Sequence, residues 1–75
     1  MKEHDRVILT EDVPSEGLTV GDVGTIVHVH AGGKAFEVEF VSLLGQTAAI
    51  ATVERRQVRA CRQNEIAHAR TLAVA

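Results

Sequence analysis

The sequence predicts a small all-β fold of five short strands, and three observations support this prediction. Apolar and polar residues alternate in short runs, and turns that contain glycine separate these runs. The chain of 75 residues has room for one domain with a small core. The core is expected to consist of short side chains, because the sequence holds two Phe but no Trp or Tyr.

The first strand is predicted at about residues 5–11, where Val7 and Leu9 alternate with positions that face the other way, among them Ile8. A loop over residues 12–18 follows. It contains Pro14, which lacks a backbone donor and favours an extended residue before it. The strand is therefore expected to end before this loop.

A β-hairpin is predicted after the tight turn at Gly21-Asp22, with strands at about residues 23–31 and 34–41. Gly32-Gly33 between them is the kind of pair that a two-residue turn needs, since both central residues take positive φ. Counting outward from this turn pairs Val29 with Phe36, His28 with Glu37, and Val27 with Val38. We expect five residues to point inward: Val27, Val29, Phe36, Val38 and Phe40.

The alternation changes phase before Val27, because Gly24 and Ile26 do not share its parity. A glycine near such a change often marks a β-bulge or a sharp bend. A bend here would let a small sheet curve on itself.

The second half of the chain predicts a fourth strand at residues 47–53, one helical turn at 54–56 and a short fifth strand at about 57–59. The fourth strand is rich in alanine, which allows another element to pack closely against it. Val58 is expected to face the core.

Residues 61–75 are predicted to form either a C-terminal tail or a short helix. Asn64 is a suitable N-cap and Glu65 suits the first turn of a helix. The apolar residues Ile66, Ala69 and Ala73 would share one stripe, with Leu72 beside it. A helix of about ten residues is marginal alone, so a frayed tail is the alternative.

The order of four strands, one helical turn and one strand is the plan of an SH3-like barrel, which residues 1–60 are expected to form. Residues 21–29 resemble the glycine-containing signature of KOW modules. The segments Asp5-Arg6-Val7, Gly21-Asp22-Val23-Gly24-Thr25 and Ala35-Phe36-Glu37-Val38-Glu39-Phe40 are similar to a family of small bacterial proteins with a domain of unknown function. The resemblance implies an architecture and a short, stand-alone chain, but no activity, cofactor or catalytic residue.

Charge is distributed unevenly along the chain. Residues 1–54 contain three basic and nine acidic residues, a net charge of −6, whereas residues 55–75 contain five Arg and Glu65, a net charge of +4. Such asymmetry is typical of a charged contact patch or of a solvated tail. The candidate partner contacts are therefore the arginines of this basic part together with the apolar residues of the predicted helix: Arg55, Arg56, Arg59, Arg62, Ile66, Ala69, Leu72 and Ala73.

Two other places in the sequence hold side chains suited to metal binding or catalysis. His28 and His30 share one strand face with Glu37 opposite, a set that binds zinc in other proteins. On a solvent-facing sheet, however, His28 and Glu37 are expected to form an ordinary cross-strand polar pair, with no metal. Cys61 lies at the edge of the domain without a predicted base or oxyanion hole, so no catalysis is expected.

These observations predict a non-enzymatic, cytoplasmic binding module without a cofactor, membrane span or internal disulfide, since Cys61 is the only cysteine. Its expected partner is another protein or a second copy of itself. One alternative is a KOW-like protein that binds nucleic acid through the arginines, although both Phe are expected inside and no stacking platform remains. Another alternative is an antitoxin-like neutraliser of a neighbouring gene product.

Overall fold

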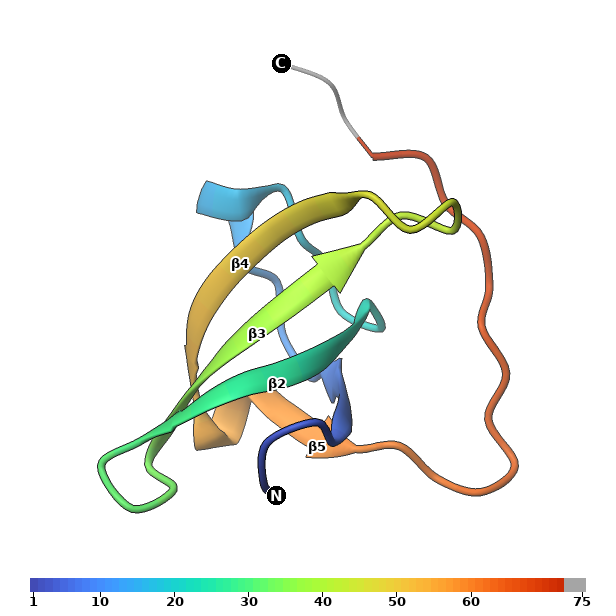
Figure 1. The fold of residues 1–75 in the computed structure, drawn as a ribbon. Helices are drawn as coiled ribbons and strands as arrows, with labels where there is room; N and C mark the ends of the chain where they lie inside the picture. Colours follow the sequence, from blue (N-terminus) through green and yellow to red (C-terminus); the bar gives the residue numbers. More distant parts are fainter. Residues whose placement is uncertain (73–75) are drawn as a thin grey trace.

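A computed structural model describes residues 1–72 and consists mainly of five strands (Figure 1). A short 3₁₀ helix follows the first strand, and another precedes the last. In chain order the elements are β1 (Arg6–Leu9), η1 (Pro14–Glu16), β2 (Val23–His30), β3 (Ala35–Val41), β4 (Thr47–Glu54), η2 (Arg55–Gln57) and β5 (Val58–Ala60). The predicted strands and the helical turn are confirmed, with boundaries shifted by one to two residues.

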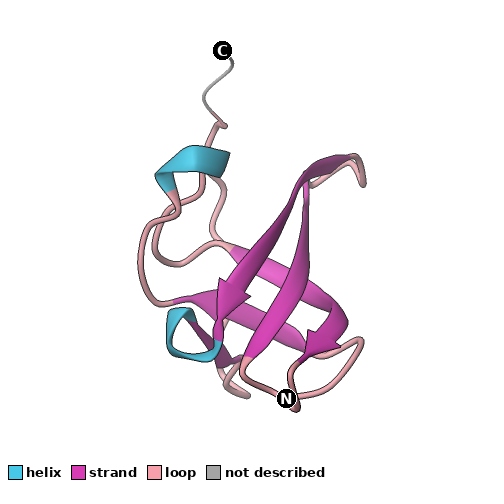
Figure 2. Cartoon of the chain, turned by 90° about the vertical axis from the view of Figure 1, so that its left-hand side faces the viewer, coloured by secondary structure: helices cyan, strands magenta, loops and turns pink. Residues whose placement is uncertain are grey.

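The five strands form one sheet in the order β4-β3-β2-β1-β5, and every neighbouring pair is antiparallel. The sheet is strongly curved, so its two ends bend around the same interior (Figure 2). β4 and β5 are its edge strands.

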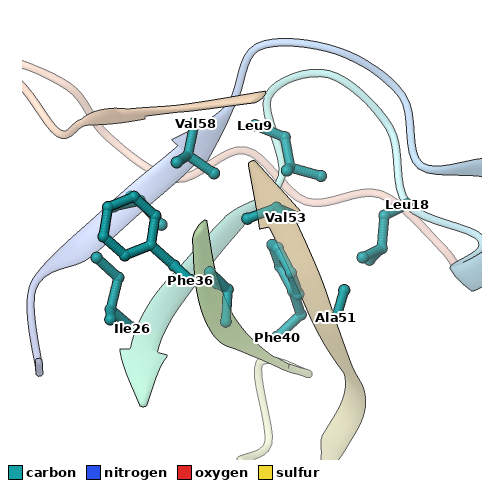
Figure 3. Close-up of a cluster of buried hydrophobic side chains, with 10 residues drawn as sticks. Leu9, Leu18, Ile26, Phe36, Phe40, Ala51, Val53 and Val58 are labelled. Atoms are coloured by element: carbon teal, nitrogen blue, oxygen red, sulfur yellow. The ribbon is translucent and has the colours of Figure 1, made fainter. Parts of the chain in front are cut away.

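The hydrophobic core lies inside this curve and receives side chains from all five strands (Figure 3). Val53 of β4 and Val58 of β5 belong to the same cluster, although their strands lie at opposite ends of the sheet. Phe36, Val38 and Phe40 of β3 are buried, as predicted. The rest of the cluster is Val7, Leu9, Leu18, Ile26 and Ala51.

The hairpin register is confirmed for His28↔Glu37 and Val29↔Phe36, but the prediction that Val27 points inward is wrong. A β-bulge between Ile26 and His28 leaves Val27 without a partner, and Val27 is 39% exposed. Ile26 pairs with Val38 instead and is fully buried. The phase change in the sequence therefore marks a bulge, but one that lies at Val27 and not at Gly24.

The turn of this hairpin is wider than predicted. Residues 31–34 separate His30 from its partner Ala35, and Ala31 has a φ of 49° in addition to the positive φ of Gly32 and Gly33. The N–H groups of Gly33 and Lys34 both donate to the His30 carbonyl, at 2.9 and 3.2 Å. The four-residue loop keeps the predicted pairing because it is centred on the same two glycines.

Of the two alternatives predicted for residues 61–75, a tail or a short helix, the helix is not found within residues 61–72, which form an extended segment with one turn near Asn64. The carboxylate of Glu65 accepts hydrogen bonds from Arg59 and from the backbone of Arg62, and this fixes the turn. The expected apolar stripe is made mainly of alanine and offers little surface to bury, so nothing offsets the cost of forming a short helix. Ala73 lies outside the described residues. Over residues 1–72, no helix has the length and apolar character needed to cross a membrane.

Gly24 is expected to be the position of β2 least tolerant of a larger side chain. A Cβ built there would lie 2.4 Å from Val38 Cγ1 and 2.9 Å from Phe40 Cε2, both in the core. Gly24→Ala should therefore destabilise the fold by about 1–3 kcal/mol through overpacking, as measured by urea unfolding. Thr25→Ala, at the next position of β2, is the control and should cost less. An equal or smaller loss in Gly24→Ala would contradict the close packing.

Candidate functional site

The arginines predicted as partner contacts, Arg55, Arg56, Arg59 and Arg62, form the arginine cluster. Most of them make contacts within the chain. Arg56 Nη1 donates to both carboxylate oxygens of Glu11, at 2.8 and 3.0 Å, and Arg56 Nε donates to Glu54 at 3.1 Å. These two carboxylates raise the pKa of Arg56, with Glu11 as the larger cause. Arg55 donates to the Gly33 carbonyl at 3.1 Å. The cluster is therefore a set of internal ion pairs and hydrogen bonds more than a free basic patch.

Arg59 anchors the beginning of the segment that follows β5. Its guanidinium makes two hydrogen bonds to Glu65, at 2.9 and 2.7 Å. Glu65 also accepts from the Arg62 backbone N–H at 2.6 Å. The Arg59 guanidinium and this backbone hydrogen bond lower the pKa of Glu65 to about 2.

A second ion pair anchors the other end of this segment. Arg70 donates from Nε to Asp22 Oδ1 at 2.7 Å and from Nη2 to Asp22 Oδ2 at 2.5 Å, and it also contacts the Gly17 carbonyl at 3.2 Å. The Arg70 guanidinium is the main cause that lowers the pKa of Asp22. Residues 61–72, named the strap here, therefore run from β5 to the turn before β2 and are held near both ends.

The strap encloses an open cavity of about 910 Å³ against the outer face of the sheet. In Figure 1 the strap runs from β5 along one side of the molecule and passes the turn between β3 and β4. Ile8 lines this cavity and is 7% exposed, so β1 is buried on both faces and not on one as predicted. Other apolar lining residues come from β2, β3 and the loops beside them: Val20, Val23, Val41 and Leu43.

Three of the predicted contact residues, Ile66, Ala69 and Leu72, line this cavity. They do so without a helix, and Ile66 is still 93% exposed, whereas Leu72 is 36% exposed. Arg62 is exposed.

The edge strand β4 is the longest unpaired edge in the sheet. Within the described residues its only strand neighbour is β3. Its residues 47–53 contain no charged side chain and no proline. Ala48, Ile50 and Thr52 point away from the core and are exposed, whereas Ala51 and Val53 are buried.

The hydrogen-bond pattern shows which groups of β4 face outward. The Arg55 N–H donates to the Lys34 carbonyl at 3.1 Å, and Glu54 is paired with Ala35. Because hydrogen-bonded and non-hydrogen-bonded pairs alternate in an antiparallel ladder, the backbone N–H and C=O groups of Ile50 and Thr52 point away from β3. These groups are available to another strand.

Two features of this surface were missed from the sequence. Arg70 was not among the predicted contact residues, and Asp22 was interpreted only as a turn residue. The two are 48 positions apart, so no local pattern links them. The charge asymmetry between the two parts of the chain was the one signal that pointed to such pairing.

The family model described as Domain of unknown function (DUF4926) matches residues 3–60. The match includes all five strands and ends where the strap begins. No curated protein and no solved structure matches the chain.

Loss of the Arg70–Asp22 pair should release the second half of the strap. In Arg70→Gln, the ¹⁵N order parameters of residues 67–71 should fall from rigid-backbone values near 0.85 to below about 0.6. Arg55→Gln is the control, since Arg55 contacts Gly33 and not the strap. Unchanged order parameters in Arg70→Gln would show that this pair does not hold the strap.

Acid should release the first half of the strap only at very low pH. The pKa of Glu65 is about 2 in the folded chain against an ordinary value of 4.5. Because the folded pKa is the lower one, ionised Glu65 stabilises this contact fully above about pH 4.5, and the contribution is lost as pH falls through about 2. An NMR titration of the Glu65 carboxyl should give a midpoint near 2, and Arg59→Gln should raise it. A midpoint near 4.5 in the unmodified chain would refute the contact.

Proposed function

The chain belongs to the DUF4926 family, whose shared domain has no known function, and we propose that it is a non-enzymatic binding module that acts through protein–protein contact. The partner we propose is a second copy of the same chain. The free edge of β4 is the observation that carries this proposal.

The first argument is that β4 lacks the usual protection of an edge strand. Exposed edges are normally shortened, bent by a bulge, or blocked by a lysine or a proline. β5, the other edge, is three residues long, whereas β4 is eight residues long. The bulge of the β3–β4 pair lies at its beginning, near Val41, and leaves the stretch around Ile50 regular.

The second argument is symmetry. Two antiparallel copies of β4 can pair about a twofold axis, so the same outward groups of Ile50 and Thr52 serve on both copies. Because residues 47–53 carry no charge, two copies meet there without like-charge repulsion. The small outward side chains Ala48 and Thr52 allow close approach.

The architecture we propose for this module is an SH3-like barrel. It is supported by the strong curvature of the sheet and by a core that joins β4 to β5 through Val53 and Val58 (Figure 3). A 3₁₀ turn before the last strand fits the same plan. In such a fold the β4 edge is left as the open side of the sheet.

Nucleic-acid binding is not proposed, because two observations weigh against it. Arg56 and Arg59 are paired with carboxylates, which reduces the positive charge available to phosphates. Both phenylalanines are buried, at 0% and 3% exposure, so neither offers a stacking surface for bases. No observation specifically favours an antitoxin-like role.

The proposal predicts a dimer whose mass is twice the 8.1 kDa of the chain. Ile50→Lys should weaken dimerisation about tenfold or more in sedimentation equilibrium, because it places two like charges at the twofold contact. Ile66→Lys is the matched control: it makes the same substitution at an exposed site on the strap and should leave the dimer intact. A monomer at all concentrations, or a dimer disrupted by Ile66→Lys but not by Ile50→Lys, would overturn the proposal.

A further inference from the structure

Three metal-ligating side chains of β2 and β3 meet on the outer face of the sheet, and the one from β3, Glu37, pairs with Thr52 of β4, so the cluster lies one strand in from the free edge. The ligand atoms of His28, His30 and Glu37 all lie within 4.8 Å of one another. From this arrangement we propose that the three residues bind a divalent transition-metal ion, with Zn²⁺ as the representative ion. This site goes beyond the proposed function, since strand pairing at β4 does not require it.

The β-bulge at Val27 is what builds the cluster. Ile26 points into the core, so in a regular strand Val27 would point outward and His28 inward again. The extra residue resets this alternation, which places His28 and His30 on the outer face and keeps Val29 against the core. Bulges are known to re-aim side chains in this way next to functional sites.

Glu37 completes the set from the neighbouring strand. It is the register partner of His28, but its carboxylate Oε2 lies 3.1 Å from Nε2 of His30. The two imidazole rings are 4.5 Å apart between centroids and are arranged edge to face. The pair expected from the sequence, His28 with Glu37 alone, is therefore incomplete, because His30 makes the closer contact.

The distances fit a tetrahedral ion after small side-chain movements. Zn²⁺ lies 2.0–2.1 Å from imidazole nitrogens and at a similar distance from carboxylate oxygens, so ligand atoms are about 3.3 Å apart in a tetrahedral site. The His30–Glu37 separation of 3.1 Å is close to this value, and His28 completes the set within 4.8 Å. The side chains of His30 and Glu37 are 41% and 38% exposed, which leaves them free to rotate around an ion.

The donor set and the local charge both favour a cation of this class. Two imidazoles and one carboxylate suit Zn²⁺ and related transition metals better than Mg²⁺ or Ca²⁺, which prefer oxygen ligands. Glu39 lies on the same face, two residues from Glu37, and adds negative charge. Three protein ligands leave a coordination position for water or a ligand from outside the chain.

Titration calorimetry of the full chain with ZnCl₂ tests the proposal. One ion should bind per chain, and His28→Ala, His30→Ala and Glu37→Gln should each weaken binding about tenfold or more, because loss of even an indirect partner of a metal site costs 10–100-fold. His68→Ala is the control: it removes a histidine of the strap and should leave the affinity unchanged. Circular dichroism establishes that each variant is folded.

Three results would overturn the proposal. The first is the absence of Zn²⁺ binding to the folded chain. The second is Zn²⁺ binding that the three substitutions leave unchanged, or that His68→Ala weakens as much as they do, since the ion would then lie elsewhere. The third is equal binding of Mg²⁺, which would contradict the assignment to a transition metal.

Discussion

The mismatch of one residue between β2 and β3 at Val27 is the constraint on which the rest of the structure depends. Before the bulge, Ile26 faces Val38 inside the core, and Gly24 lets β2 approach the side chains of β3 closely. After the bulge, Val29 faces Phe36, and the two histidines face outward. A single extra residue therefore lets both halves of a long strand bury apolar side chains, increases the local twist and creates the outer cluster.

The curvature of the sheet decides which surfaces remain for function. Both ends bend around one small core, so that Val53 and Val58 share it. The β5 end is short and continues into the strap, which is tied down by Arg59–Glu65 and Arg70–Asp22. The β4 end is long, uncharged over residues 47–53 and paired on one side only. The difference between the two ends is why we propose binding at β4 and not at the strap.

Local patterns predicted what depends on neighbouring residues. The two glycines at 32–33 and the alternation of β3 were sufficient for the hairpin register from His28 to His30, since both act over a few positions, but the register before the bulge was wrong. The exact place of the bulge was not predictable, because Ile26 and Val27 are both apolar and either could face the core. For residues 61–75 the sequence was compatible with a tail or a short helix, since the spacing of Ile66 and Ala69 fits a helical stripe. The contact that holds the strap joins Arg70 to Asp22, 48 positions away, and no local pattern predicts it.

The free edge of β4 is tested most directly by the exchange of individual backbone amides with solvent. In a single chain the N–H groups of Ile50 and Thr52 have no partner on β3 and should exchange rapidly, whereas the inward N–H of Ala51 should be protected. If two copies pair through β4, the protection of Ile50 and Thr52 should rise with protein concentration while that of Ala51 changes little. Rapid exchange of Ile50 and Thr52 at every concentration would contradict binding at this edge.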